Sequence, residues 1–317
     1  MTKRPLGNSG LQVAPLALGG NVFGWTIDQN TSFAVLDAFV DFGFNLIDTA
    51  NVYSAWVPGN QGGESETIMG RWFAASGKRD RIVLATKVGM KMGDGSRGLK
   101  KENILKSVEE SLKRLQTDYI DLYQSHEDDE QAPLEETLSA YDALIRQGKV
   151  RAIGASNYTA ARLRKALEIS TSQHLPAYIS LQPEYNLYDR AGFEAELESL
   201  CLEKNLGVIS YYSLASGFLT GKYRSEADFA KSARGGGVGK YLNDRGFRIL
   251  AALDEISAVH GVPLATVALA WLIQRPAVTA PIASATSVDQ LAELVKAAAI
   301  TLSPEDVARL DQASAAG

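Results

Sequence analysis

The sequence predicts an α/β protein built as a (β/α)8 TIM barrel, with an N-terminal β-hairpin and two extra helices. Three observations support this fold class. Short apolar runs alternate with longer helical patterns along nearly the whole chain, as successive strand–helix units do. Three of the runs, 44–48, 82–87 and 119–126, end at an ionisable side chain, where a parallel barrel places its chemistry. No linker rich in proline or serine interrupts the alternation, so residues 1–317 are expected to form a single domain.

The expected elements follow in chain order. A hairpin covers 4–13, with Asn8, Ser9 and Gly10 in its turn. Strands are predicted at 16–19, 44–48, 82–87, 119–124, 150–154, 178–182, 207–212 and 278–282. Helices are predicted at 31–42, 64–76, 101–115, 134–147, 159–170, 192–205, 263–274 and 287–298, with extra helices at 246–260 and 303–314. Ser303 before Pro304 marks a helix start, and Gly148 marks a helix end.

Composition excludes several classes of function. The net charge of −5 and the pI near 5.4 argue against nucleic acid as a partner. No apolar stretch approaches the roughly 18 residues that cross a membrane, and the first residues lack an apolar signal segment, so we expect a cytoplasmic protein. The single cysteine, Cys201, allows no internal disulfide. The three histidines lie far apart without metal-ligand spacing, so no metal site is expected.

Four polar residues follow three successive predicted strands: Asp48, Tyr53, Lys87 and His126. Each alone has an ordinary structural explanation, as a turn former, a rim aromatic, a solvated lysine or a loop histidine. Their shared position favours a proton-transfer site at one rim of the barrel. A tyrosine, with a pKa of about 10, donates a proton poorly at neutral pH, and a neighbouring ammonium would lower that pKa. Lys87 is the candidate for this ammonium, and Asp48 would keep it charged and oriented.

Two glycine-rich segments resemble nucleotide-binding motifs without matching them. Residues 19–24 follow a strand but lack the GxGxxG spacing and do not open a helix. Residues 235–240 resemble a phosphate loop, but Arg234 stands where a glycine is needed and Tyr241 replaces the Ser or Thr that would hold magnesium. We interpret the second segment as a flexible loop over the site.

The order Asp48, Tyr53, Lys87, His126 resembles the aldo-keto reductases, as do residues 6–13, 47–53 and 154–157, and the resemblance spans about 3–314. It implies that the hairpin plugs the far end of the barrel and that a small carbonyl compound is reduced with NADPH. Tyr53 would be the general acid, Lys87 would tune it, Asp48 would orient Lys87, and His126 would position the substrate. The cofactor residues implied are Gly20, Ser156, Asn157, Gln182, Tyr211, Ser213, Leu214, Gly217, Lys222, Arg234, Ser284, Thr286, Gln290 and Glu293.

The last of these positions bear on the choice of cofactor. Many relatives carry basic residues around 284–290, where this chain has Ser284, Thr286 and Gln290, and it is closer to the branch of the potassium-channel β subunits. NADP is favoured over NAD, because Thr286, a helix N-terminus, Lys222 and Arg234 remain to hold a 2′-phosphate.

Other interpretations remain open at this stage. The protein could act as a cofactor-sensing regulatory partner, as channel β subunits do. It could also be a barrel isomerase or aldolase that forms a Schiff base on Lys87. Phe23, Trp25 and Trp56 indicate either an apolar or aromatic aldehyde substrate or the packing of rim loops. The sequence leaves the oligomeric state open.

Overall fold

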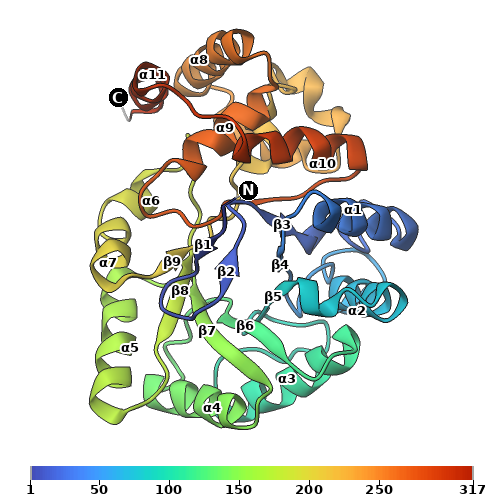
Figure 1. Ribbon diagram of the computed structural model, residues 1–317, viewed down its shortest axis with the longest axis vertical. Helices are drawn as coiled ribbons and strands as arrows, with labels where there is room; N and C mark the ends of the chain where they lie inside the picture. Colours follow the sequence, from blue (N-terminus) through green and yellow to red (C-terminus); the bar gives the residue numbers. More distant parts are fainter. Residues whose placement is uncertain (1, 316–317) are drawn as a thin grey trace.

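A computed structural model describes residues 2–315. Its centre is a sheet of eight parallel strands in the order β10-β3-β4-β5-β6-β7-β8-β9, with the helices on the outside (Figure 1). The strands are β3 (Ala17–Gly19), β4 (Leu46–Asp48), β5 (Val83–Val88), β6 (Ile120–Ser125), β7 (Val150–Ser156), β8 (Tyr178–Gln182), β9 (Gly207–Val208) and β10 (Ile282–Ala283).

Backbone hydrogen bonds join the two edges of this sheet. Val208 of β9 forms a parallel bridge with Val278, and the Val208 carbonyl accepts from the Thr279 N–H at 2.9 Å. Two residues on, the Ile282 N–H donates to the Ser210 carbonyl at 2.8 Å. The predicted (β/α)8 barrel is therefore confirmed, and the carboxyl ends of its strands meet at one rim.

The outer layer follows the predicted alternation. Its helices are α1 (Gln29–Asp41), α2 (Glu64–Ser76), α3 (Lys101–Leu115), α4 (Leu134–Arg146), α5 (Ala160–Gln173), α6 (Ala191–Glu194), α7 (Leu197–Lys204), α8 (Asp244–His260), α9 (Leu264–Ile273), α10 (Val288–Val295) and α11 (Pro304–Ser314). The two extra helices, α8 and α11, lie together at one end of the molecule (Figure 1). Ser303 caps α11 in a capping box with Asp306, as its sequence predicts.

The antiparallel hairpin of β1 (Arg4–Pro5) and β2 (Gln12–Val13) closes the amino-terminal end of the barrel. Leu6 and Val13 are fully buried in one cluster with inward-facing residues of the strands. Gly7 has a φ of +52°, and a Cβ there would lie 2.2 Å from the Ile179 carbonyl oxygen, so only glycine fits this contact. The expected plug is confirmed, and it leaves the opposite rim for chemistry.

Three predicted elements differ from the structure. The strand expected at 207–212 is only two residues long, Gly207–Val208, and beyond it Tyr211 forms an isolated bridge with Glu184. The helix expected at 192–205 is divided into α6 and α7, because Glu196 leaves the helical region at φ −137°. The last strand is expected at 278–282, but only Ile282–Ala283 pairs with β3, since the preceding residues direct their N–H groups to β9 instead.

Across residues 2–315 no single helix is both long and apolar enough to cross a bilayer. Helices α8 and α9 reach the required length only as a pair that bends by 95°.

Candidate active site

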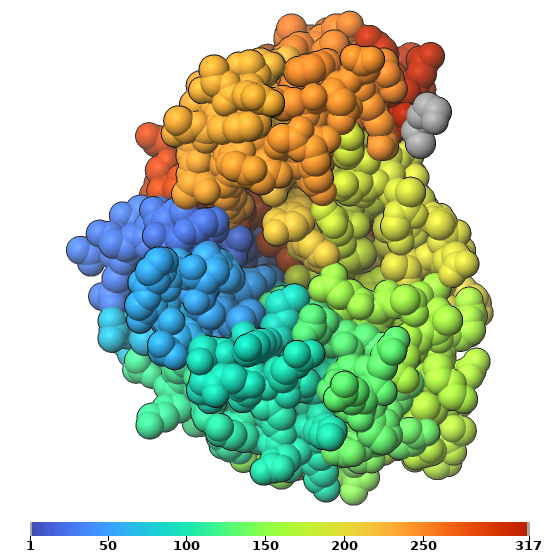
Figure 2. All heavy atoms as spheres, turned by 180° about the vertical axis from the view of Figure 1, so that it is seen from behind, coloured from blue at the N-terminus to red at the C-terminus, as the bar shows by residue number. Residues whose placement is uncertain are grey.

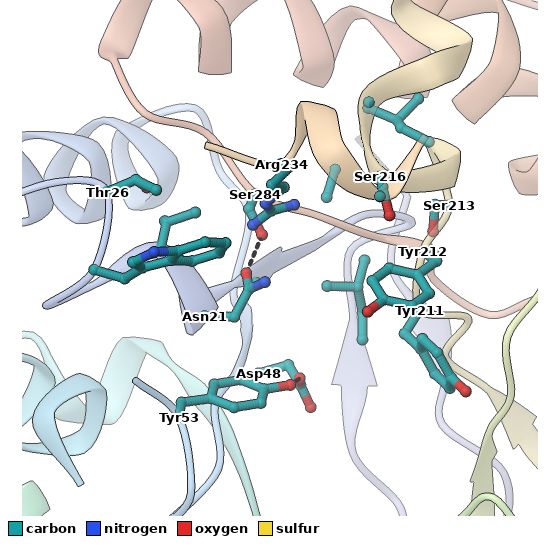
Figure 3. A pocket seen from close by; sticks show the side chains of 18 of the residues that line it. Asn21, Thr26, Asp48, Tyr53, Tyr211, Tyr212, Ser213, Ser216, Arg234 and Ser284 are labelled. Atoms are coloured by element: carbon teal, nitrogen blue, oxygen red, sulfur yellow. Dashed lines mark hydrogen bonds between the residues drawn. The ribbon is translucent and has the colours of Figure 1, made fainter. Parts of the chain in front are cut away.

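A cavity of about 1090 Å³ opens at the carboxyl ends of the strands, where Figure 2 shows a hollow in the surface. It lies between the loops that follow β3 and β4 on one side and the long segment between β9 and α8 on the other. Figure 3 shows side chains from these separate parts of the chain facing this space. Asp48, Tyr53 and His126 all line it.

A buried lysine lies beneath the cavity floor. The Lys87 Nζ donates to Asp48 Oδ2 at 2.6 Å, to the Thr49 carbonyl at 2.8 Å and to the Tyr53 hydroxyl at 2.9 Å. Lys87 is fully buried, and its three donors are therefore all engaged. Neighbouring strands β4 and β5 hold this arrangement, since Asp48 ends the first and Lys87 lies near the end of the second. The structure thus brings together the four residues that the sequence places at strand ends.

The pKa of Tyr53 is shifted in the direction opposite to the prediction. Burial raises the Tyr53 pKa well above its usual value of 10, and the negative charge of Asp48 raises it further. Asp48 lies 3.5 Å from the phenol oxygen and is itself paired with Lys87, so its charge offsets that of the ammonium. Burial also lowers the pKa of Lys87, against the opposing effect of Asp48. Tyr53 therefore keeps its proton at neutral pH, as a proton donor must.

His126 forms the wall beside Tyr53. Its backbone N–H donates to the Val88 carbonyl at 2.8 Å, and its ring meets the Tyr53 ring edge to face at a centroid distance of 5.9 Å. Burial, followed by the nearby charge of Lys87, lowers the His126 pKa well below its usual 6.5. The ring is consequently neutral at physiological pH and can donate one hydrogen bond into the cavity.

Two amides hold the second oxygen of Asp48. Gln182 Nε2 donates to Asp48 Oδ1 at 2.8 Å, and Gln124 Nε2 donates to the same atom at 3.1 Å. Sequence reasoning missed Gln124, although it lies two residues before His126 at the end of a predicted strand. Gln182 lines the cavity as predicted, but its amide nitrogen is occupied by Asp48 and Gln124, so only its oxygen is left to face a cofactor.

The residues expected to hold the nicotinamide lie next to one another. Ser156 Oγ donates to the Gln182 carbonyl at 2.8 Å, and Asn157 Nδ2 donates to the His126 carbonyl at 2.9 Å. The Tyr211 hydroxyl donates to Asn157 Oδ1 at 2.7 Å. Tyr212, which sequence reasoning missed, lines the cavity beside Tyr211 and is half exposed (Figure 3).

The loop expected at the pyrophosphate also borders the cavity. Ser213, Leu214, Gly217 and Lys222 line it, and the chain turns sharply through left-handed backbone at 215–217. Arg234 reaches the cavity from the next segment, with its guanidinium 5.3 Å from the centre of the Trp25 ring.

Three residues expected at the adenosine end line the cavity, and two other predicted cofactor residues lie apart from it. Ser284 donates to Asn21 Oδ1 at 2.6 Å (Figure 3), and the Thr286 N–H donates to Gln290 Oε1 at 2.7 Å. Glu293 instead forms an ion pair with Lys296 at 2.8 Å on the surface of α10. Gly20 is buried, and its carbonyl accepts from Ser65, so its neighbours Gly19 and Asn21 line the cavity in its place.

The chain belongs to the Aldo/keto reductase family, whose sequence model matches residues 15–315. It is 36% identical over 308 residues to the uncharacterized oxidoreductase YrpG of Bacillus subtilis (strain 168), covering 95% of this chain and 92% of that protein. It is 34% identical over 321 residues to a probable voltage-gated potassium channel subunit beta of Oryza sativa subsp. japonica (98% and 96%). It is 33% identical over 331 residues to the L-glyceraldehyde 3-phosphate reductase of Escherichia coli O157:H7 (100% and 93%).

Family membership makes the chain an oxidoreductase of a kind that generally depends on NAD(P)H. The hydrogen-bonding groups that line the cavity suit such a cofactor. Amide and hydroxyl groups of Ser156, Asn157 and Gln182 gather at one end, beside the Tyr211 ring. Further along the cavity, towards the N-terminus of α10, the lining consists of glycine, hydroxyl groups and the Lys222 ammonium. Such a lining favours the binding of phosphate.

The low pKa of His126 predicts that kcat/KM does not change as the pH is lowered below neutral. An ordinary histidine becomes about 90% protonated between pH 7.5 and 5.5, but His126 stays neutral because its pKa lies well below 6.5. Tyr53 stays protonated over the same range. We therefore expect kcat/KM for an uncharged aldehyde to remain constant from pH 7.5 to 5.5. An inflection near pH 6.5 that disappears in His126→Gln would contradict this prediction.

Proposed function

We propose that this protein is an NADPH-dependent reductase of aldehydes and ketones in which Tyr53 is the general acid. The observation that carries the proposal is the position of the Lys87 Nζ, within 2.9 Å of the Tyr53 hydroxyl and 2.6 Å of Asp48. A carbonyl reduction needs a proton donor at the oxygen that becomes an alcohol and a group that orients the carbonyl. Tyr53 and His126 face the same cavity and meet both needs.

Each residue has a distinct role in this proposal. A bound nicotinamide cofactor would supply the hydride. The Tyr53 hydroxyl donates its proton to the substrate oxygen, and the Lys87 ammonium stabilises the phenolate that remains. Asp48 keeps Lys87 charged and aimed at Tyr53, while the amides of Gln124 and Gln182 hold the Asp48 carboxylate in place. The neutral imidazole of His126 donates a hydrogen bond to the carbonyl oxygen.

The test is the reduction of 4-nitrobenzaldehyde by Tyr53→Phe and Lys87→Met. We expect each change to lower kcat by about 10²- to 10⁴-fold, the usual contribution of general acid catalysis. Cofactor binding, followed by fluorescence, should stay near the wild-type value. Tyr119→Phe is the matched control, because it removes a phenol just before the amino-terminal end of β6, away from the cavity. Full activity in either active-site variant would contradict the roles assigned to Tyr53 and Lys87.

The choice of NADPH over NADH is part of the proposal. Thr286 lines the cavity just before the N-terminus of α10, and that N-terminus and Lys222 offer partners for a 2′-phosphate. In parallel fluorescence titrations we expect a lower Kd for NADPH than for NADH, and a smaller difference between the two in Lys222→Met. A lower Kd for NADH would show that this chain uses NAD instead.

Two other candidate functions have less support than a reductase. A Schiff base on Lys87 needs a free and accessible amine, whereas this amine is fully buried with all three donors engaged. A regulatory role is suggested by the potassium channel subunit beta among the relatives. It predicts cofactor binding without aldehyde turnover, which the assay with 4-nitrobenzaldehyde would reveal.

A further inference from the structure

Gln124 is a fully buried polar residue of β6 whose side chain reaches the carboxylate that pairs with Lys87. Gln124 Nε2 donates to Asp48 Oδ1 at 3.1 Å, and Gln124 Oε1 accepts from Gln182 Nε2 at 3.2 Å. Gln182 Nε2 also donates to Asp48 Oδ1 at 2.8 Å, so the two amides and the carboxylate form a closed ring of hydrogen bonds. Both ends of the Gln124 amide therefore contact residues of the site.

The barrel places Gln124 level with Lys87 and leaves space for its side chain. The two residues are register partners on the neighbouring strands β5 and β6, and Gln124 is also the register partner of Gly154 on β7. A Cβ at Gly154 would lie 3.2 Å from Gln124 Cγ and 2.4 Å from Ser180 Oγ, closer than such atoms pack without strain. The glycine thus leaves the room in the barrel interior that the Gln124 side chain occupies.

The chemistry of Asp48 fixes the orientation of both amides. A carboxylate that is paired with an ammonium accepts hydrogen bonds and donates none, so Gln124 and Gln182 must both direct their NH2 groups at it. These two amides hold Asp48 Oδ1. The other oxygen, Oδ2, is thereby directed at Lys87, at 2.6 Å from Nζ.

Asp48 Oδ2 is also close enough to compete for the proton that Tyr53 has to give. It lies 3.5 Å from the Tyr53 oxygen, at the outer limit of a hydrogen bond. The Tyr53 oxygen accepts from Lys87 at 2.9 Å, so the hydrogen of the phenol is left for a substrate. A rotation of the carboxylate towards Tyr53 would bring the two oxygens to the ~2.7 Å of an ordinary O–H···O bond. Tyr53 would then donate to Asp48 and no longer to the substrate.

We propose that Gln124 is a positioning residue that keeps Asp48 directed at Lys87 and away from Tyr53. It holds Asp48 Oδ1 together with the Gln182 amide, and this leaves the Tyr53 hydrogen free for the substrate oxygen. Gln124 is fully buried and is not among the described residues that line the cavity, so it acts through Asp48. The inference rests on the proposed reductase function and adds a residue to it.

The first test is Gln124→Met, which keeps the length of the side chain and removes its donor and its acceptor. With 4-nitrobenzaldehyde we expect kcat to fall by about 10- to 100-fold, as for the loss of a hydrogen bond to a charged group. KM and the Kd for NADPH should stay within about threefold of wild type. Gln173→Met is the matched control, because it changes an exposed glutamine at the end of α5 and should leave kcat unchanged. An unchanged kcat in Gln124→Met would overturn the proposal.

A double variant separates positioning from a loss of packing. In Asp48→Asn the group that Gln124 positions is already altered, so adding Gln124→Met should lower kcat by less than about twofold further. A loss of packing would act in both backgrounds, and losses that multiply would therefore overturn the proposal. A wild-type protein that reduces no aldehyde would overturn the reductase function and this inference with it. With an active wild type, the comparison of variants tests the inference alone.

Gln124→Glu provides a test that does not need Gln124→Met to fold. A protonated carboxyl has nearly the shape of the amide and can donate to Asp48, whereas an ionised one repels it. Burial and the charge of Asp48 raise the pKa of the new carboxyl, against the effect of Lys87, above the ~4.3 of an ordinary glutamate. We expect kcat of this variant to fall about tenfold from pH 5.5 to 9.5, while kcat of the wild type stays within about twofold. A variant whose kcat is as constant as that of the wild type would overturn the proposal.

Discussion

The ion pair between Lys87 and Asp48 is the interaction on which the site depends. An ammonium that is fully buried loses its hydration, and this loss is strongly unfavourable unless other groups replace the water. Here Asp48, the Thr49 carbonyl and the Tyr53 hydroxyl take that place, each within 2.9 Å. The tyrosine is thus a ligand of the ammonium as well as a residue of the cavity wall. Removing Asp48 leaves the buried Lys87 ammonium without its counter-ion.

The barrel makes this arrangement possible. Parallel strands that pair in sequence bring their carboxyl ends to one rim, so residues as far apart as Asp48 and Gln182 come within hydrogen-bond distance, at 2.8 Å. The hairpin fills the opposite end with Leu6 and Val13, which leaves a single rim open. Because Lys87 lies below the cavity floor while Tyr53 lines the cavity, the ammonium contacts the Tyr53 hydroxyl at 2.9 Å without lining the cavity itself.

Much of this could be predicted from the sequence because strand ends are visible as apolar runs that stop at a polar residue. Asp48, Lys87 and His126 were found in this way, and the spaced motifs supplied Tyr53. Gln124 was missed because it lies within a run of strand residues and has no charge. The direction of the Tyr53 pKa shift was predicted wrongly, because burial, which raises this pKa most, and the nearness of Asp48 both depend on the folded structure. Glu293 forms a local ion pair with Lys296, three residues further along the chain, on the surface away from the cavity.

The central claim is that Asp48 and Lys87 act on Tyr53 as one unit. A double-mutant cycle with Asp48→Asn and Lys87→Met, measured as kcat/KM for an uncharged aldehyde, tests it most directly. If the pair acts as a unit, the double variant should be no slower than the slower single variant, because the second change removes a group that has already lost its function. Losses that multiply in the double variant would contradict the claim and would give the two residues separate roles.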